Sequence, residues 1–202
     1  MKILITALMS CGLLLQAASP VPRPAGPYKI TEPSGQQLDI NSFKGKVCLV
    51  QFLFTWCPHC AATAEKFTTL QNELGPKGLQ VIGVAFNDED DSRGKKADGP
   101  ELARFKLAHA GFPVGYVSRT SVLKYLGFSV MDRLSVPLVM IIDRNGIVQY
   151  QDNPTPSADS QNLTFLREKL GKLLDAKADP KMGASAKASP SKVAAPKAHP
   201  GN

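Results

Sequence analysis

An apolar run of eight residues limits the folds open to this chain more than any other feature. Residues 47–54 read VCLVQFLF, in which Gln51 is the only polar residue. Such a run is typical of a strand that is buried on both faces, as in a sheet covered by helices. Hydrophobic residues make up 43% of the 202 residues, which is enough for one domain with a real core plus tails.

Two cysteines follow this strand at the start of a predicted helix. Residues 56–60 read Trp-Cys-Pro-His-Cys, and apolar side chains at helical spacing continue to residue 74. This order places Cys57 at the helix N-terminus, where unpaired N–H groups and the macrodipole favour an anion. Pro58 suits the first helical turn because its missing N–H would be unpaired there. A thiolate is such an anion and is the reactive form of cysteine, so we expect Cys57 to be the exposed attacking sulfur and Cys60 the buried resolving thiol.

The rest of the chain alternates between strand and helix patterns. The expected elements are a small hairpin over 28–40, a helix over 60–74, a strand over 79–86, a helix over 100–110, a strand over 112–117, a helix over 120–126, strands over 138–143 and 147–151, and a helix over 162–174. In the helix over 100–110 we expect Leu102, Phe105 and Leu107 to cluster in part. Asn145-Gly146 is a hairpin-turn signal. Strands that alternate with helices before a final hairpin predict an α/β fold with a mixed sheet.

The first 27 residues predict export and a spacer. Lys2 precedes a mostly apolar stretch over 3–15 and small residues up to 19, the pattern of a secretory signal peptide over 1–18. The apolar stretch is too short to span a bilayer comfortably. Alternatives are a lipoprotein signal in which Cys11 is lipidated, or an N-terminus that is retained as an anchor. We therefore expect an exported, periplasmic or extracytoplasmic protein with a Pro-rich, extended spacer over 19–27.

The folded domain is expected over residues 28–175, and a disordered tail over 176–202. The tail is rich in Ala, Lys, Pro and Ser and holds too few large apolar residues to fold. A share of the basic residues behind the net charge of +7 lies in this tail. Because no basic stripe with interleaved aromatic residues is present, we expect no binding to nucleic acid.

A single Cys-x-x-Cys pair has two chemical interpretations. It can be half of a zinc site, but a closed zinc site needs four ligands, and the sequence has no second such pair. The histidines His109 and His199 are isolated in the sequence. The pair can also be a redox dithiol, which the preceding strand and the following helix favour. The sequence therefore predicts redox chemistry at Cys57 and Cys60, with no metal and no cofactor.

Four motifs in combination resemble the TlpA/ResA branch of the thioredoxin superfamily. They are Gly45-Lys46-Val47 through Phe52, Trp56 through Cys60, Val136-Pro137, and Asp143-Arg144-Asn145-Gly146. The resemblance covers residues 28–175 and implies a thioredoxin-like fold with a central insertion, and thiol–disulfide oxidoreductase activity. It also implies that the Val136–Pro137 bond is cis, that this proline faces the dithiol, and that Val136 and Pro137 bind substrate. Trp56 precedes the first cysteine, and we expect it to pack beside the motif and shape the same substrate-binding surface. Protein thiols and disulfides would be the substrates, and a membrane protein the redox partner.

Two features bear on how closely the chain follows that pattern. Thioredoxins have a buried Asp before the first cysteine, at the position of Gln51, which cannot titrate. Some relatives have a Glu in the central insertion that assists the dithiol, and the run Asp88-Glu89-Asp90-Asp91 follows the second strand here. We interpret that run as a solvated acidic loop.

The dipeptide between the cysteines bears on the direction of electron flow. Pro58-His59 is similar to the dipeptide of DsbA-type oxidases, and His59 can stabilise a Cys57 thiolate through a hydrogen bond or its charge. A more stable thiolate means a more stable reduced form, and potentials run from about −270 mV in thioredoxin to about −120 mV in DsbA. TlpA-like relatives usually act as reductants. The sequence leaves the direction of electron flow open. We expect a lowered Cys57 pKa and a protein that is more oxidising than thioredoxin.

Two other activities occur on this kind of fold. Peroxiredoxins resemble the pattern P-x-x-x-T-x-x-C, but Val50 and Phe54 stand at the Pro and Thr positions. Sco-type copper chaperones have a CxxxC spacing and a His before the last hairpin, whereas this chain has CxxC and no His near Val136. Both activities remain alternatives to thiol–disulfide exchange. Cys48, inside the buried strand, is expected to be an inert small hydrophobe.

Overall fold

The strand predicted from the apolar run lies in the middle of an eight-stranded sheet. The computed structural model describes residues 19–87 and 96–176, so the expected signal peptide, the acidic run 88–91 and the tail beyond residue 176 lie outside the described residues. The strand order is β1-β8-β7-β4-β5-β6-β2-β3. The strands are β1 (Arg23–Pro24), β2 (Lys29–Thr31), β3 (Gln37–Asp39), β4 (Val47–Leu53), β5 (Leu79–Ala85), β6 (Val114–Tyr116), β7 (Leu138–Ile142) and β8 (Ile147–Gln151).

Parallel and antiparallel pairs occur in the same sheet, as predicted. Strands β4, β5 and β6 run parallel, whereas β7 pairs antiparallel with both β4 and β8. The predicted hairpins β2–β3 and β7–β8 are both present, and Gly146 closes the second with a φ of +80°. The predicted α/β class with a mixed sheet is therefore confirmed.

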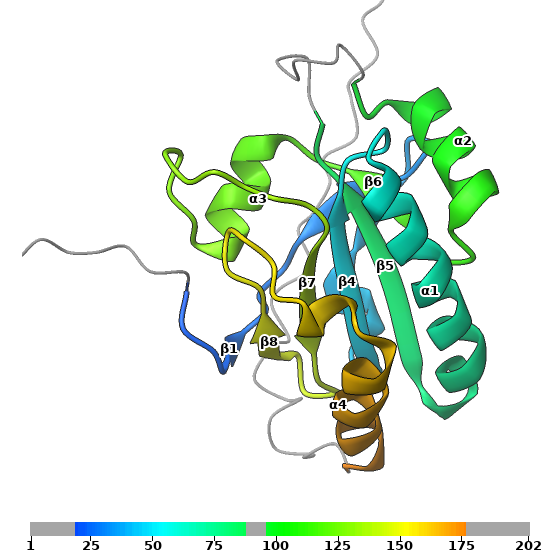
Figure 1. Ribbon diagram of the computed structural model, residues 1–202, viewed down its shortest axis with the longest axis vertical. Helices are drawn as coiled ribbons and strands as arrows, with labels where there is room; N and C mark the ends of the chain where they lie inside the picture. Colours follow the sequence, from blue (N-terminus) through cyan, green and yellow to red (C-terminus); the bar gives the residue numbers. More distant parts are fainter. Residues whose placement is uncertain (1–18, 88–95, 177–202) are drawn as a thin grey trace, which may run out of the picture.

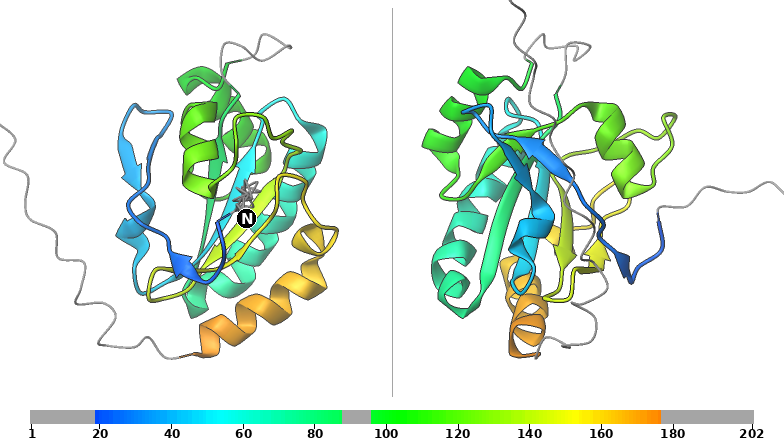
Figure 2. Two further views of the ribbon diagram at one scale, coloured as in Figure 1. Left: turned by 90° about the vertical axis from the view of Figure 1, so that its left-hand side faces the viewer. Right: turned by 180° about the vertical axis from the view of Figure 1, so that it is seen from behind.

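Every predicted helix is present and shifted by at most two residues at each end. The helices are α1 (Pro58–Leu74), α2 (Gly99–His109), α3 (Arg119–Leu126) and α4 (Leu163–Asp175), with short 3-10 turns η1 (Ile40–Phe43), η2 (Gly75–Lys77) and η3 (Asp159–Gln161). Side chains of α1, α2 and α4 join one buried cluster, and those of α3 join another on the opposite face of the sheet. Figure 1 shows α1 and α4 in front of the sheet, and Figure 2 shows it from the side and from behind. Within the described residues, the structure contains no helix with the length and hydropathy of a membrane span.

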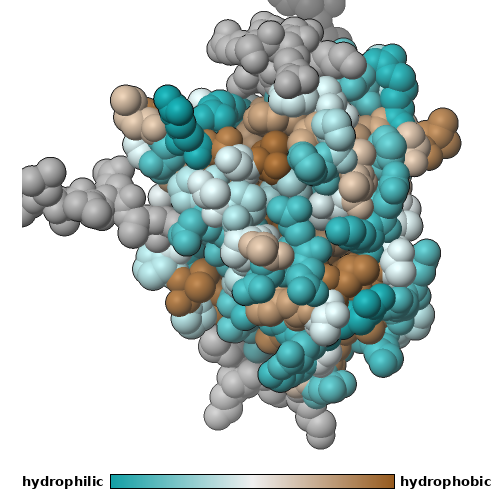
Figure 3. Space-filling model, in the orientation of Figure 1, coloured by the Kyte–Doolittle hydropathy of each residue, from teal (hydrophilic) through white to brown (hydrophobic). Residues whose placement is uncertain are grey.

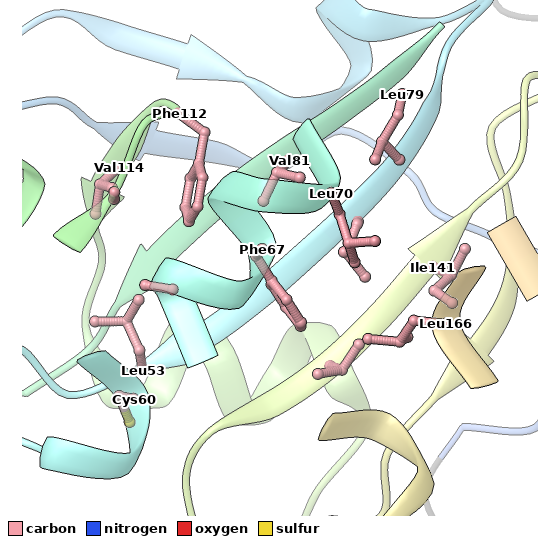
Figure 4. Packing of buried hydrophobic residues seen from close by; sticks show 14 of the residues in the cluster. Leu53, Cys60, Phe67, Leu70, Leu79, Val81, Phe112, Val114, Ile141 and Leu166 are labelled. Carbon is pink, nitrogen blue, oxygen red and sulfur yellow. The ribbon is translucent and has the colours of Figure 1, made fainter. Parts of the chain in front are cut away.

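Strand β4 contributes to both buried clusters because its side chains alternate between the faces. Val47, Leu49 and Leu53 join the cluster under α1. Cys48, Val50 and Phe52 join the cluster on the other face. Figure 4 shows Leu53 beside Cys60, with further apolar side chains of α1 over the sheet. The strand therefore ends, and α1 begins, inside a packed apolar environment.

One predicted core residue is on the surface. Leu102 and Phe105 of α2 are buried as expected, but Leu107 is 91% exposed, so its predicted place in the cluster is wrong. Two residues of α-helix correspond to a rotation of about 200°, which turns Leu107 away from the face that Phe105 buries.

The first strand lies within the segment expected to be a spacer. Arg23 and Pro24 pair with β8 at the edge of the sheet, where a proline costs no ladder bond. The Arg23 guanidinium donates to the carbonyl oxygen of Tyr125 at 3.0 Å and to Oε1 of Gln151 at 2.6 Å. The folded domain therefore includes residues of the expected spacer, N-terminal to residue 28.

Candidate active site

The expected site residues meet at one edge of the sheet. Strand β4 ends at Leu53, and the antiparallel β7 begins at Leu138, which pairs with Phe52. The residues that follow β4 and those that precede β7 therefore lie at the same edge. The structure brings these expected site residues to that edge: Trp56, Cys57, Pro58, His59, Cys60, Val136 and Pro137. The Val136–Pro137 bond is cis, as the family resemblance implies.

Cys57 is the capping residue of α1. Its backbone is extended, with φ −83° and ψ 116°, and its sulfur accepts a hydrogen bond from the N–H of Cys60 at 3.3 Å. Pro58 occupies the first helical position, where no N–H is needed. The thiol thus has the place that a Ser or Asp oxygen usually takes at a helix N-terminus, which favours its ionised form.

The two thiols differ in accessibility, but neither is freely exposed. Cys57 is 7% exposed and Cys60 is fully buried, whereas Pro58 and His59 between them are exposed. The prediction of an exposed Cys57 is therefore wrong in degree. Cys57 belongs to the buried cluster under α1, against which Trp56 packs, so that only a small part of its surface reaches solvent.

The environment separates the pKa values of the two thiols. A hydrogen bond with the Cys60 side chain, with smaller contributions from the N–H groups of Cys60 and His59 and the charge of His59, lowers the pKa of Cys57 to about 6, against the effect of burial. Burial, and then the contact with Cys57, raises the pKa of Cys60. Burial raises the pKa of Cys48 on the opposite face to about 12, in agreement with an inert thiol. A thiolate at neutral pH therefore belongs to Cys57.

Asn87, which is not among the site residues predicted from the sequence, holds the turn between β4 and Cys57. Its side chain is buried, accepts from the N–H of Thr55 at 3.1 Å and donates to the Thr55 hydroxyl at 3.0 Å. Phe54 and Trp56 lie on either side of Thr55 in this turn, and the centroids of their rings are 5.2 Å apart. Asn87 comes directly after the second apolar strand, at the same edge of the sheet as the cysteines. This polar residue at a strand end is a pattern from which its role could have been predicted.

Gln51 lies under the first turn of α1. It is fully buried on the α1 face of β4, and its Nε2 donates to the carbonyl oxygen of Cys60 at 2.9 Å. Its Oε1 is buried and has no hydrogen-bond partner among the described residues. The side chain that replaces the titratable Asp of thioredoxins therefore contacts the backbone of the resolving cysteine.

Asp152 is a second buried polar residue that the sequence analysis missed. It is 3% exposed, and its carboxylate accepts from the N–H of Val139 at 2.8 Å, from the hydroxyl of Tyr150 at 2.8 Å and from the N–H of Ser157 at 3.3 Å. Burial raises its pKa. Because Val139 is close in sequence to Pro137, Asp152 fixes the start of β7 beside the dithiol.

No metal site is evident in the part of the chain that the structure describes. Within residues 19–87 and 96–176, no group of three or more His, Cys, Asp or Glu side chains could hold an ion. The described cysteines, Cys48, Cys57 and Cys60, are free thiols. The chemistry that the site itself supports is that of a vicinal dithiol.

The fold and the dithiol together are those of a thioredoxin-like protein. A thiol:disulfide interchange protein of the thioredoxin family from Chlorobium tepidum has the same fold, with a TM-score of 0.60 and 20% identity over 78% of this chain and 99% of that chain. The model of the Redoxin family matches residues 16–164. The chain belongs to the Redoxin family.

Relatives with related names support that membership. The thiol:disulfide interchange protein DsbE of Vibrio cholerae is 29% identical over 122 residues, which are 60% of this chain and 57% of DsbE. The thiol-disulfide oxidoreductase ResA of Bacillus thuringiensis is 28% identical over 125 residues, which are 60% of this chain and 62% of ResA. The matches therefore span less than two thirds of these curated relatives. They confirm the resemblance to the ResA branch, whereas the likeness of Pro58-His59 to DsbA stays a prediction.

Proposed function

We propose that this protein is an exported thiol–disulfide oxidoreductase that exchanges a disulfide between Cys57 and Cys60 with protein thiols. The observation that supports it most directly is the capping geometry, in which the N–H of Cys60 donates to the sulfur of Cys57. The hydrogen bond with the Cys60 side chain, and to a smaller extent this backbone bond, lowers the pKa of Cys57 to about 6. Only a thiolate attacks a disulfide, and this sulfur is ionised at neutral pH. The names of the relatives point to the same reaction.

In the reducing direction the reaction has two steps. The Cys57 thiolate attacks one sulfur of a substrate disulfide, forms a mixed disulfide and releases the other sulfur as a thiolate. Cys60 then loses its proton, attacks Cys57 and releases the second substrate sulfur. Two electrons pass to the substrate, which leaves with two thiols after taking one proton from Cys60 and one from solvent.

In the oxidising direction the same steps run backwards, and the stability of the reduced form decides which direction prevails. A thiolate that is stable at neutral pH stabilises the reduced protein and makes the disulfide a stronger oxidant. His59 contributes to the lowered Cys57 pKa through its charge, and the exposed Pro58 and His59 tune the potential in this proposal. We therefore place the potential above that of thioredoxin, about −270 mV.

Trp56, Val136 and Pro137 form the substrate-binding surface in this proposal. Trp56 and Val136 are half-buried and pack against the cluster that contains both sulfurs. Val136 lies just outside the β4–β7 ladder, where an added strand of substrate would find backbone groups beside Cys57. Export rests on the N-terminal sequence pattern over 1–18, and a membrane protein would restore the redox state of the dithiol.

Equilibration with glutathione tests the proposal. The chain is incubated in buffers of graded glutathione redox potential, alkylated, and its free thiols are counted by mass spectrometry. We expect a single transition of two thiols that maps to Cys57 and Cys60, at a potential above about −270 mV. Cys48→Ser is the matched control and should leave the transition unchanged. A two-thiol transition that survives in Cys57→Ser/Cys60→Ser would refute the proposal.

A further inference from the structure

Two large apolar side chains stand in solvent on the loop that leads to the cis proline. Val130 and Met131 are 75% and 85% exposed, and they are adjacent in the loop between α3 and β7. On the face shown in Figure 3, hydrophilic residues predominate and hydrophobic ones form scattered spots. Exposed apolar area costs free energy, so a partner that covers these two adjacent side chains would gain from their burial.

The backbone under this pair is held in a defined turn. The N–H of Ser129 donates to Oδ2 of Asp132 at 2.7 Å, and the N–H of Asp132 donates to the carbonyl oxygen of Ser129 at 3.1 Å. The N–H of Met131 donates to the Ser129 hydroxyl at 3.2 Å. Because these bonds close the turn on itself, the turn presents Val130 and Met131 outward. We call residues 129–132 the apolar turn.

The apolar turn is continuous with the dithiol site. The same loop runs on through Leu134 and Val136, which are half-buried and pack against the core. Val136 packs in both clusters, as does Phe54, whose ring contacts Trp56 beside Cys57. In Figure 1 the loop extends from α3 to the start of β7, and the cis bond between Val136 and Pro137 directly precedes that strand. A partner bound at Cys57 can therefore extend along this loop onto the turn.

The charges beside the turn indicate what kind of partner fits. Arg133 is exposed next to the turn, and the guanidinium of Arg119 reaches the carbonyl oxygen of Asp132 at 3.5 Å. The carboxylate of Asp132 is the only acidic group in residues 119–133, and the N–H of Ser129 already binds it. Arg119 and Arg133 therefore lie beside a turn whose one carboxylate is already bound by a backbone N–H, and this charge balance favours a partner with negative charge.

We infer that the apolar turn is a docking element for a polypeptide substrate whose cysteine lies near apolar side chains with acidic neighbours. The inference rests on the proposed exchange at Cys57. Val130 and Met131 bury apolar area of the substrate, and Arg119 and Arg133 attract its carboxylates. A small thiol or disulfide reaches Cys57 without touching the turn, so the turn selects proteins over small molecules.

The probes are three cysteine compounds, each joined to thionitrobenzoate through a disulfide, and they compare the rates at which Cys57 attacks different substrates. One short peptide has a Cys flanked on both sides by Leu, Phe and Glu, and a second has Ser and Gln in their place; free cysteine is the small-molecule probe. The Cys57 thiolate of the reduced full chain bonds to the cysteine sulfur and displaces coloured thionitrobenzoate, whose release gives the rate. We expect the wild type to prefer the apolar acidic peptide about tenfold, from partial burial of two side chains.

Variants of the apolar turn test whether the turn causes the peptide preference without affecting the reaction at Cys57. Val130→Ser/Met131→Ser should abolish most of the preference, and Arg133→Gln should weaken it at low salt, while the rate with the cysteine probe stays unchanged. Leu107→Ser is the matched control, because Leu107 is 91% exposed on α2, and it should keep the preference.

Three results would overturn the inference. The first is a peptide preference that survives in Val130→Ser/Met131→Ser, and the second is an equal loss of the preference in Leu107→Ser. The third is a wild-type dimer in sedimentation that becomes a monomer in Val130→Ser/Met131→Ser, which would assign the turn to self-association. A wild type no faster than Cys57→Ser/Cys60→Ser with every probe would instead refute the proposed exchange itself, and the docking inference with it.

Discussion

The backbone N–H of Cys60 lies 3.3 Å from the sulfur of Cys57 and donates to it. The side chain of the same residue is the largest cause of the lowered Cys57 pKa. Burial, and then the contact with Cys57, raises the pKa of Cys60 in return. The resolving cysteine therefore has two roles. It stabilises the attacking thiolate before the reaction, and it replaces the substrate sulfur afterwards.

Removing the thiol of Cys60, which donates a hydrogen bond to Cys57, should raise the pKa of Cys57. In Cys60→Ala the side-chain hydrogen bond is lost, and because a bond to a charged group contributes about 1.5–3 kcal/mol, we expect an increase of about one to two pH units. Cys60→Ser keeps a hydroxyl donor and should shift the pKa less. The rate of alkylation of Cys57 by iodoacetamide as a function of pH measures both values. Equal pKa values in the wild type and Cys60→Ala would contradict the assignment.

The redox potential should depend on pH in two regimes. Below the Cys57 pKa of about 6, reduction takes up two protons with two electrons, and the potential should fall by about 59 mV per pH unit. Above pH 6 the reduced form keeps only the Cys60 proton, so the slope should halve to about 30 mV per pH unit. Glutathione equilibria between pH 5 and about 8 measure the slope. A constant slope of about 59 mV over that range would contradict a Cys57 thiolate at neutral pH.

The lowered Cys57 pKa also makes the reduced protein more stable as pH rises. The thiol ionises near pH 6 when folded and at about 8.5 when unfolded, so its contribution to the free energy of unfolding is absent below pH 6 and grows up to about 8.5. Urea unfolding of reduced wild type and Cys57→Ser at pH 5.5 and about 8 should show a difference that increases with pH. A difference independent of pH would contradict this linkage.

Breaking the contact of Asn87 with Thr55 should loosen the turn before Cys57. Asn87→Leu removes both hydrogen bonds and leaves the N–H of Thr55 without its partner, so we expect a loss of about 1–3 kcal/mol in the free energy of unfolding. Thr55→Val removes only the hydroxyl contact and should cost about 1 kcal/mol. Urea unfolding of both variants and their double variant measures the coupling. Additive losses would show that the two side chains act independently.

Replacing Asp152 by Asn should destabilise the fold most at acid pH. An Asn side chain has only one acceptor oxygen, so its amide nitrogen would face the N–H of either Val139 or Ser157, which costs about 1–3 kcal/mol. Because burial raises the Asp152 pKa, the wild-type carboxyl contributes most when protonated, and this contribution falls as pH rises above about 4. The stability difference between wild type and Asp152→Asn should therefore narrow from pH 4 to 7 in urea unfolding. A difference that widens would contradict the raised pKa.

Much of the fold could be predicted because local pattern and tertiary structure agree. The apolar run of β4 is buried on both faces, and Cys57 caps the helix that its spacing predicts. The prediction for Leu107 failed because residues that are two positions apart in a helix, as Phe105 and Leu107 are, do not share a face. Strand β1 was missed because two residues in a Pro-rich segment have no periodicity to detect.

The positions of the two sulfurs could be predicted from the sequence, whereas the contacts of the buried polar residues around them could not. A Cys-x-x-Cys pair before a helix is a local signal, whereas Asn87 and Asp152 act across the fold, on Thr55 and Val139. Those contacts depend on strand order and register, which the sequence alone does not specify. The near burial of Cys57 likewise depends on what packs against it.

Mass spectrometry of a trapped mixed disulfide tests most directly that Cys57 is the attacking sulfur and Cys60 the resolving one. Cys60→Ser, reduced and mixed with the thionitrobenzoate disulfide of the apolar acidic peptide, should gain the mass of one peptide, and fragmentation should locate it on Cys57. In the wild type the adduct should be transient, because Cys60 resolves it to a disulfide. An adduct on Cys48, or the same stable adduct in wild type and Cys60→Ser, would contradict the account.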